Sequence, residues 1–316
     1  MQCLIYKKHS IMEIFTVEGA GRYKLSTAVS RPEGEAKGVL QMVHGMAEHK
    51  ERYFPMMEFL AKKGYICVMN DLRGHGASVE SERDLGFFGR KGYRKLVEDE
   101  RLVTLWARSE FPGLPIYLYG HSMGSMIVRE YIKHHDELIS GLVVCGSPSA
   151  NAAAGLGKAL ATIVILFNGW RYRSSLLQAI STDSYEKAFK KEKTPNSWIC
   201  SDPAVVEAYN ADPLCGFRFT ANGYRSLFSL LQDIYSKGGW QMKNPGLPIM
   251  FIAGAEDPCI VNVKKYAQAV NFLRERGYTS VTSKIYPEMR HEIHNEPGKE
   301  AVWQDIVSAM ELWSGK

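Results

Sequence analysis

A serine held between two glycines is the residue of this chain best suited to chemistry. Residues 120–124 read Gly-His-Ser-Met-Gly, with an apolar run at 115–119 before them and a helix-like stretch at 125–135 after them. A serine in a sharp turn between a strand and a helix stands exposed above the sheet, in a strained backbone that only small neighbours tolerate. The pattern therefore predicts Ser122 as a nucleophile.

A serine hydroxyl is a weak nucleophile at neutral pH, so it needs a base and a group that fixes the base's tautomer. For a serine in such a turn, the expected chain order is Ser, then Asp or Glu, then His, each on a loop after a strand. Residues 251–257 end one apolar run with Asp257, and residues 285–291 end the last run with His291. We predict that His291 is the base and that Asp257 anchors it.

Each of these two assignments has a neighbouring rival. Glu256 precedes Asp257, but a residue before Pro258 is biased toward an extended backbone that presents its side chain. His294 follows His291, but it falls in a predicted helical turn rather than directly after the strand. We favour Asp257 and His291 on this placement.

Ester cleavage also needs donors for the negative oxygen that develops on the carbonyl. The apolar run at 38–43 ends in His44-Gly45-Met46, where Gly45 lets the chain turn and aim the N–H of Met46 at the site. The N–H of Met123 begins the helix after the serine, where the helix dipole favours an anion. The alternative for residues 44–46 is a simple turn at a strand end.

Other histidines and carboxylates are predicted to have structural roles. The glycine-containing loop 71–78 should stiffen the neighbouring donor loop by hydrogen bonding, because Asp71 and His75 precede the serine in the chain. His121 is expected to shape the turn. The run 291–294 is one residue too short for the zinc motif H-E-x-x-H, so we predict no metal and no cofactor.

The elements that would position these groups alternate along the chain. Residues 1–30 alternate in polarity around a Gly-Ala-Gly turn, which predicts an antiparallel pair of edge strands. The strands predicted after them lie at 38–43, 65–69, 115–119, 141–145, 248–253 and 280–286, and the helices at 53–63, 93–110, 125–135, 261–276 and 299–313. Such alternation predicts an α/β fold, a mostly parallel sheet with helices on both faces and its chemistry beyond the carboxyl ends of the strands.

The alternation is interrupted at residues 148–240, which are helical in pattern and rich in aromatic residues. We interpret them as an inserted cap subdomain, with residues 1–147 and 241–316 forming the core. The most apolar run, 159–167, is either a lid helix that lines an acyl tunnel and touches lipid, or a helix buried between cap and core. In the first case Ile163, Phe167 and Trp170 would contact the substrate.

Composition limits the class of protein. The 316 residues are 45% hydrophobic and 23% charged with a net charge of +5, and the scattered lysines and arginines argue against nucleic-acid binding. A transient contact of the cap with anionic membrane surfaces stays open, as does the oligomeric state. The six cysteines form no C-x-x-C pair, the N-terminus lacks the apolar core of a signal peptide and no apolar run is long enough to span a membrane. We therefore predict a cytoplasmic protein with reduced thiols.

Four motifs together resemble the α/β-hydrolase superfamily, and within it the monoacylglycerol lipase and lysophospholipase-like branch of serine aminopeptidase S33-type hydrolases. The resemblance covers nearly the whole chain. The motifs are H-G-x-x-E-H…R-Y at 44–53, D-x-x-G-H-G-x-S at 71–78, G-H-S-M-G-S at 120–125 and H-E…N-E at 291–296. It implies that Ser122 is the nucleophile, Asp257 the anchor and His291 the base, with amide donors at Met46 and Met123. It also brings Cys259 close to where some monoacylglycerol lipases carry a thiol.

The expected activity is the hydrolysis of carboxylic esters through an acyl-enzyme, with monoacylglycerol or a similar lipid monoester as the leading substrate. The alternatives are a lysophospholipase, a short-chain or aromatic carboxylesterase, an aminopeptidase and an acyltransferase. An epoxide hydrolase or dehalogenase would need Asp in place of Ser122. A receptor-like scaffold that binds a ligand without turnover is the alternative outside enzymes.

Overall fold

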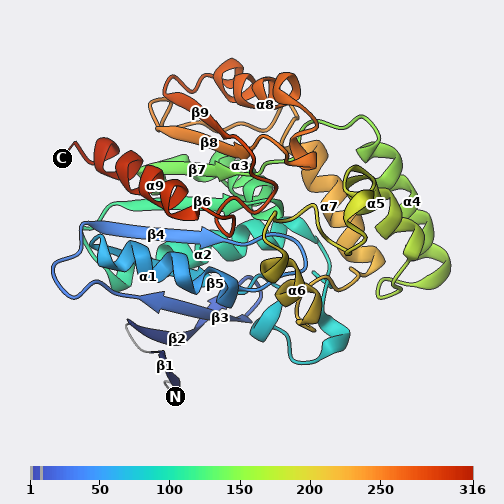
Figure 1. The fold of residues 1–316 in the computed structure, drawn as a ribbon, viewed down its shortest axis with the longest axis horizontal. Helices are drawn as coiled ribbons and strands as arrows, with labels where there is room; N and C mark the ends of the chain where they lie inside the picture. Colours follow the sequence, from blue (N-terminus) through green and yellow to red (C-terminus); the bar gives the residue numbers. More distant parts are fainter. Residues whose placement is uncertain (1–2, 8–9, 316) are drawn as a thin grey trace.

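The structure, a computed structural model, describes residues 3–7 and 10–315, which form one nine-stranded sheet in the order β1-β2-β3-β5-β4-β6-β7-β8-β9 (Figure 1). β1, β2, β3 and β5 pair in antiparallel fashion, and all pairs from β5 to β9 are parallel. The strands are β1 (Cys3–Lys7), β2 (Ser10–Gly19), β3 (Tyr23–Ser30), β4 (Gly38–Val43), β5 (Tyr65–Asn70), β6 (Ile116–His121), β7 (Gly141–Cys145), β8 (Ile249–Gly254) and β9 (Val281–Tyr286). The predicted α/β architecture is confirmed, with one difference: β1 makes a third antiparallel strand where the sequence predicted a pair.

Helices cover both faces of the sheet. On one face lie α1 (Phe54–Lys62) and α9 (Lys299–Trp313), and on the other α2 (Tyr93–Glu110), α3 (Met123–His135) and α8 (Val263–Arg276). Every residue of β4, β5, β6 and β7 is buried, which is why these strands are continuous apolar runs rather than alternating ones. The described parts of the chain contain no helix with both the length and the apolar character needed to cross a bilayer.

The order of the strands decides where the loops meet. β6 lies between β4 and β7, with Val43 opposite Gly120 and Gly120 opposite Val144. β8 and β9 continue the sheet in parallel, with Gly254 opposite Tyr286. The carboxyl ends of these strands therefore lie at one edge of the sheet, and the loops that follow them converge there.

Four helices are inserted between β7 and β8: α4 (Ala154–Asn168), α5 (Ser175–Ala188), α6 (Pro203–Ala211) and α7 (Ala221–Asp233). We call residues 154–233 the cap segment. Three of its helices begin at side-chain caps, because Ser174, Asp202 and Thr220 each accept a hydrogen bond from a backbone N–H of the first turn. The cap segment lies beside the edge of the sheet where the loops converge (Figure 1).

Candidate active site

The turn at Ser122 has the strained geometry that the sequence predicted. Ser122 has φ 54° and ψ −117° and precedes α3 directly. A Cβ on Gly120 would lie 2.5 Å from the carbonyl oxygen of Gly124, and one on Gly124 would lie 2.2 Å from that of Val43. Neither approach is compatible with a side chain, so both glycines are required for the serine to sit above β6.

The structure brings Ser122, His291 and Asp257 together from three separate loops. His291 Nε2 lies 2.8 Å from Ser122 Oγ, and His291 Nδ1 lies 2.9 Å from Asp257 Oδ1. Asp257 Oδ1 also accepts the backbone N–H of Cys259 at 2.8 Å, which fixes the carboxylate. With a proton on Nδ1, His291 donates to Asp257 and its Nε2 is free to accept the Ser122 proton.

The two rival residues have other partners. Glu256 is exposed, and its carboxylate lies 3.8 Å from Arg290 Nε. The ring of His294 is buried and stacks on Tyr53, with ring centroids 4.5 Å apart.

The surroundings of His291 stabilise its protonated form. Burial has the largest single effect and disfavours the imidazolium, but the charge of Asp257 together with the hydrogen bonds and the neighbouring Cys259 outweighs it, and the pKa of His291 is raised well above its ordinary value. The ring of Trp198, from the cap segment, lies 4.9 Å from the His291 ring, and Cys259 Sγ lies 3.9 Å from Nε2. The site therefore favours transfer of a proton onto this histidine.

Met46 and Met123 line the same cavity as Ser122, and among the described residues their backbone N–H groups have no hydrogen-bond partner. Gly45 lets the loop approach closely, since a Cβ there would lie 2.6 Å from Glu48 Oε1 and 3.0 Å from Ser122 Cβ. Two free N–H groups beside a nucleophile are suited to bind a developing oxyanion.

A buried carboxylate that the sequence analysis gave no role organises the loop after β4. Glu48 accepts hydrogen bonds from the Gly45 N–H at 2.6 Å, from Arg52 at 2.7 Å and from the Tyr53 hydroxyl at 3.0 Å. Burial opposes its ionisation, but the hydrogen bond to His121 and the charge of Arg52 hold the pKa of Glu48 well below its usual range. Its place as the glutamate of the motif H-G-x-x-E-H was the one sequence feature that could have indicated this role.

Arg52 connects this loop to the one that carries His291. Its two terminal nitrogens bind the Glu292 carboxylate at 2.7 and 2.6 Å, and its guanidinium lies 4.8 Å from the ring centre of Tyr209 in α6. Such bidentate pairs fix orientation as well as distance. The loops that carry Met46 and His291 are therefore held in a fixed position relative to each other.

The loop after β5 stiffens the donor loop, as the sequence predicted. Asp71 accepts from the backbone N–H of Lys50 at 2.8 Å and from its ammonium at 2.6 Å, with both side chains almost fully buried. The ring of His75 accepts the Ala47 N–H at 3.2 Å. These bonds join the two loops beside Ser122 without contacting its hydroxyl.

We expect the substitution Asp71→Asn to lower the free energy of unfolding by about 3–5 kcal/mol, because it leaves the buried Lys50 ammonium without its counter-charge. Chemical denaturation measures the change. The matched control is Glu311→Gln, which removes a carboxylate from the exposed pair with Lys37 and should cost less than about 1 kcal/mol. Equal losses in the two variants would contradict the role given to Asp71.

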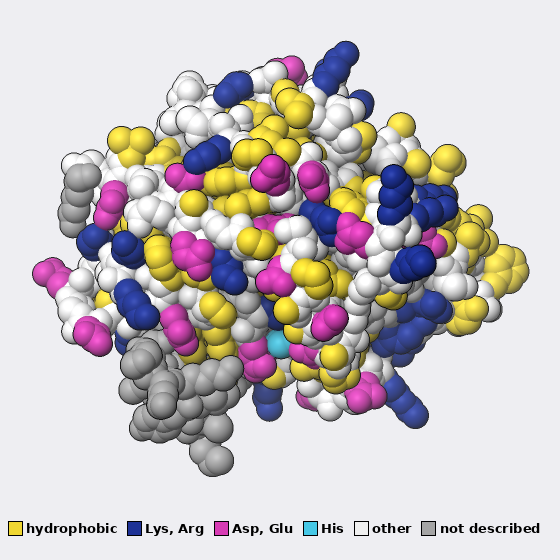
Figure 2. Space-filling model, in the orientation of Figure 1, with side chains coloured by type: hydrophobic (Ala, Val, Ile, Leu, Met, Phe, Trp, Pro, Cys, Tyr) yellow, Lys and Arg dark blue, Asp and Glu magenta, His cyan; other side chains and the backbone are white. Residues whose placement is uncertain are grey.

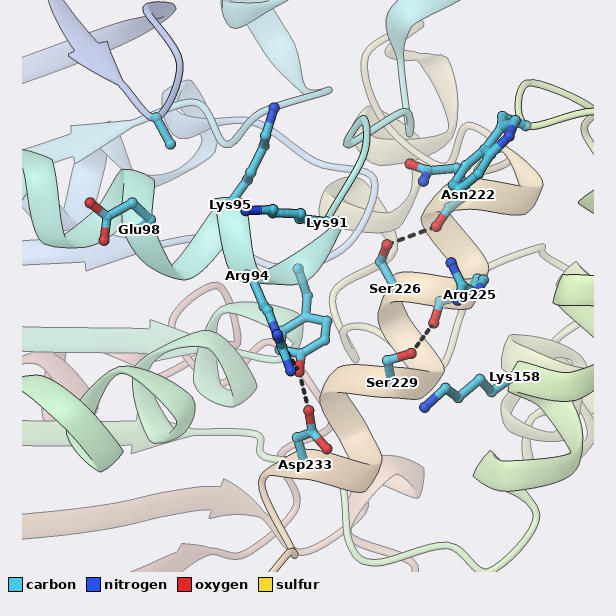
Figure 3. Close-up of a pocket in the computed structure, with 14 residues that line it drawn as sticks. Lys91, Arg94, Lys95, Glu98, Lys158, Asn222, Arg225, Ser226, Ser229 and Asp233 are labelled. Carbon is cyan, nitrogen blue, oxygen red and sulfur yellow. Dashed lines mark hydrogen bonds between the residues drawn. The ribbon is translucent and has the colours of Figure 1, made fainter. Parts of the chain in front are cut away.

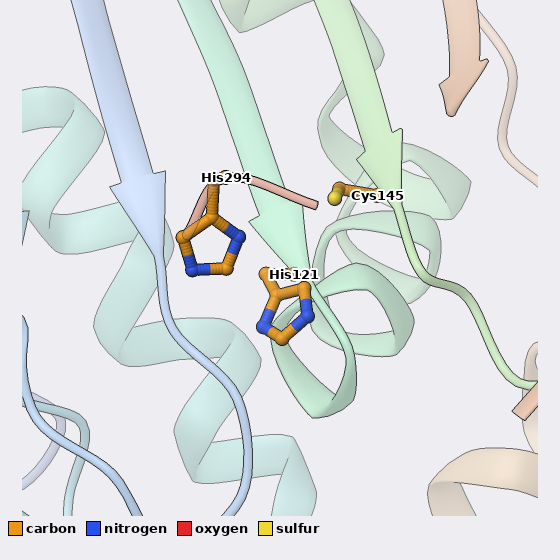
Figure 4. A group of neighbouring side chains, drawn as sticks. All are labelled: His121, Cys145 and His294. Carbon is orange, nitrogen blue, oxygen red and sulfur yellow. The ribbon is translucent and has the colours of Figure 1, made fainter. Parts of the chain in front are cut away.

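Figure 4 shows His121, Cys145 and His294 as neighbours near the end of β6, and their donor atoms lie within 4.8 Å of one another. The nitrogens of His121 already have partners, the Tyr53 hydroxyl at 3.1 Å and the His291 carbonyl oxygen at 3.2 Å. Burial raises the pKa of the Cys145 thiol and lowers that of His294 well below its ordinary value. With the nitrogens of His121 already engaged and the Cys145 thiol protonated, this cluster suits packing under the turn rather than metal ligation.

The cavity at Ser122 has a volume of about 150 Å³ and a mixed lining. Its apolar wall comes from α3 and α7: Met126, Leu227, Phe228 and Leu231. Polar side chains come from α5 and the loop after it, Gln178, Ser181, Thr182 and Asn196, and α5 also contributes Ile180 and Tyr185. An ester bound at Ser122 would meet both apolar surfaces and hydrogen-bonding groups.

The structure corrects the placement predicted for three residues of the cap segment. Ile163, Phe167 and Trp170 are 50%, 83% and 40% exposed and lie outside the cavity at Ser122. The reason is that α4 packs its small residues onto α7, where a Cβ on Gly157 would lie 2.9 Å from the Phe228 ring, and so turns Ile163 and Phe167 outward. Cys259 is buried and does line the cavity.

Comparison with known proteins agrees with this geometry. The family model described as serine aminopeptidase, S33 matches residues 34–298. The chain is 28% identical to a monoacylglycerol lipase of Mycolicibacterium smegmatis, with 92% of this chain and 94% of that protein aligned. It is 30% identical to the monoglyceride lipase of Homo sapiens, with 90% and 84% aligned.

Among solved structures, a thermostable carboxyl esterase from Bacillus coagulans, crystallised with glycerol, superposes with a TM-score of 0.85 at 25% identity. The superposition covers 99% of this chain and 98% of the esterase. The chain thus belongs to the serine aminopeptidase S33 family of α/β-hydrolases, in its monoacylglycerol lipase branch, and is an ester hydrolase.

Proposed function

We propose that this enzyme cleaves carboxylic esters through an acyl-enzyme on Ser122. His291 Nε2 takes the hydroxyl proton as Ser122 Oγ bonds to the ester carbonyl carbon, and the N–H groups of Met46 and Met123 hold the resulting oxyanion. Collapse breaks the bond to the alcohol, which leaves with the proton from His291. His291 then deprotonates a water that attacks the acyl-enzyme, and the acid departs with Ser122 restored.

The observation that carries this mechanism is the unbroken relay from Ser122 Oγ to His291 at 2.8 Å and from His291 to Asp257 at 2.9 Å. Asp257 and His291 are each 2% exposed, so water competes little for their hydrogen bond. Each oxyanion donor would contribute about 3 kcal/mol of transition-state stabilisation.

The leading substrate is monoacylglycerol or a similar lipid monoester. The mixed lining of the cavity supports this choice, because Met126, Leu227 and Leu231 offer apolar surface for an acyl chain and Ser181 and Thr182 offer hydrogen bonds to a hydroxylated alcohol. The names of the relatives point the same way. Each methylene buried against the apolar wall adds about 0.8 kcal/mol of binding.

The size of the cavity favours a second candidate, a short-chain esterase. At about 150 Å³ it is smaller than the roughly 300–1,000 Å³ typical of pockets for drug-sized ligands. A long acyl chain would therefore need the cap segment to move away from the core. A short ester would need no such movement.

A series of monoacylglycerols of increasing acyl length separates these candidates. For a lipid hydrolase we expect kcat/KM to rise about fourfold per methylene until the apolar wall is covered. The substitution Leu231→Trp should fill part of that wall and lower the rates for long chains only, with acetate esters as the internal control. A maximum at acetate or butyrate would reject the lipid assignment in favour of the short-chain esterase.

The cap segment carries exposed apolar side chains that support transient contact with a membrane surface. Leu156, Leu166 and Phe167 of α4 are 76%, 77% and 83% exposed. Figure 2 shows hydrophobic side chains gathered at the edge of the molecule where α4 lies, with lysines and arginines nearby. Such patches commonly mark surfaces that meet lipid or protein. We propose that residues 148–240 act as a cap that meets lipid in this way, with residues 1–147 and 241–316 as the catalytic core.

The cysteines support a reducing compartment. Cys67, Cys145, Cys200, Cys215 and Cys259 are buried and free. A cytoplasmic location is consistent with such thiols.

A further inference from the structure

A second cleft, separate from Ser122, lies where the start of α2 meets the cap segment. It has a volume of about 690 Å³, and α2, α4 and α7 all contribute side chains to it (Figure 3). Five of the lining residues are basic: Lys91, Arg94, Lys95, Lys158 and Arg225. None of them lines the cavity at Ser122.

The positive charge of this cleft is poorly compensated. Its two carboxylates balance only part of that charge: Glu98 pairs with Arg101 at 2.6 Å, and Asp233, which accepts a hydrogen bond from the Tyr93 hydroxyl, faces five basic side chains. Over residues 12–315, where side chains are described, Lys91, Lys95 and Lys158 take part in no ion pair. Like charges gathered in a concave site raise the local concentration of an anion.

The cleft is built on packed elements rather than on loose surface chains. Gly92, directly before α2, lies against α7 so closely that a Cβ on it would be 2.1 Å from Ser226 Oγ. Arg225 Nε donates to Thr162 Oγ1 of α4 at 3.1 Å, which joins α7 to α4 beside Lys158. The backbones that carry the basic residues are therefore held in fixed relation to one another.

Exposed apolar side chains of α4 lie a few residues along the chain from one residue of the cleft, Trp170. Trp170 lines the cleft. The Arg225 guanidinium lies over its indole ring, 6.0 Å from the centre of that ring. Leu166 and Phe167, a few residues before it, are more than three-quarters exposed. Basic groups beside exposed apolar and aromatic groups are the combination that binds anionic lipid surfaces.

We propose that this cleft binds the phosphate headgroup of an anionic phospholipid and so holds the cap segment against an anionic membrane. Lysine and arginine side chains supply charge-assisted hydrogen bonds to phosphate oxygens, and the neighbouring apolar side chains meet the acyl region. The proposal rests on the membrane contact proposed above, and it is independent of the chemistry at Ser122.

The test compares sedimentation of the protein with phosphatidylcholine vesicles and with vesicles that also contain phosphatidylglycerol. We expect binding that requires phosphatidylglycerol and falls about fivefold per lysine removed, or about 100-fold in the triple variant Lys91→Gln/Lys95→Gln/Lys158→Gln. The control, Lys62→Gln/Lys264→Gln/Lys265→Gln, removes the same charge from exposed positions on α1 and α8 and should bind nearly as the parent does. Hydrolysis of the soluble ester p-nitrophenyl butyrate should be unchanged in both variants, which shows that both are folded.

Three results would overturn the proposal: equal binding to both kinds of vesicle, undiminished binding of the first triple variant, or equal losses in the two triple variants. A further arm titrates glycerol 3-phosphate and inorganic phosphate. If the triple variant Lys91→Gln/Lys95→Gln/Lys158→Gln loses affinity for these soluble phosphates but still binds vesicles as the parent does, the ligand is a soluble phosphate and the headgroup assignment is wrong. Because sedimentation does not depend on turnover, the two triple variants still test the proposal if the ester-hydrolase mechanism fails, with circular dichroism in place of hydrolysis as the check that both are folded.

Discussion

Replacing Ser122 with alanine should lower kcat for ester hydrolysis about 10⁶-fold, because no other group can form the acyl-enzyme once this hydroxyl is gone. The loss should appear in steady-state hydrolysis of p-nitrophenyl butyrate. Covalent labelling by a fluorophosphonate should disappear with it, since the label reports the same activated oxygen. KM should change little, because the walls of the cavity are left intact.

The matched control for this variant is Ser308→Ala, at an exposed position on α9 far along the chain from the three loops of the site. It should keep both turnover and labelling. Near-normal turnover in Ser122→Ala would reject the assignment of the nucleophile. A parent protein that takes up no label and hydrolyses no ester would instead favour the receptor-like scaffold.

The sequence predicted best those parts of the fold that are determined by residues close together in the chain. The strands Gly38–Val43 and Gly141–Cys145 and the helix Tyr93–Glu110 have the bounds that the sequence predicted. Buried parallel strands are short apolar runs bounded by polar or glycine residues, so their ends are visible without an alignment. The turn at Ser122 was equally visible, because the clashes that demand its two glycines arise within a few residues of it and from the adjacent strand.

The contacts that hold the site together were not visible, because their partners are far apart in the chain. Arg52 and Glu292 are separated by 240 positions, and nothing in their spacing indicates a bidentate pair. Trp198 reaches the His291 ring from the cap segment, where no motif accompanies it. Only the packing of the cap segment on the core brings these groups together.

The orientation of α4 shows a different limit. Its sequence is apolar on most sides, so periodicity alone does not indicate which face is buried. Close packing against α7 determines which face of α4 is buried, because Gly157 and Ala161 permit an approach that larger side chains would block. Ile163 and Phe167 consequently face outward, and most of the helical lining of the cavity comes from α3, α5 and α7.

Replacing Asp257 with asparagine should lower kcat about 10⁴-fold while leaving the backbone of the loop in place, because the amide favours the wrong tautomer of His291. The matched control is the adjacent Glu256→Gln, which removes a carboxylate that is exposed and does not contact the histidine. It should keep activity within a few-fold of the parent. Loss of activity in Glu256→Gln with retention in Asp257→Asn would exchange the two roles.

The pH dependence distinguishes an anchoring role for Asp257 from a merely structural one. His291 must be neutral to accept the Ser122 proton, so activity is lost as pH falls through the pKa of His291. Burial lowers that pKa, but the charge and hydrogen bond of Asp257, with the neighbouring Cys259, raise it well above its ordinary value, so the acidic limb of the parent profile should lie above about 6.5. In Asp257→Asn the imidazolium loses this counter-charge and the limb should move to lower pH, whereas in Glu256→Gln it should stay where it is. An acidic limb that does not move in Asp257→Asn would show that this carboxylate does not set the protonation of the base.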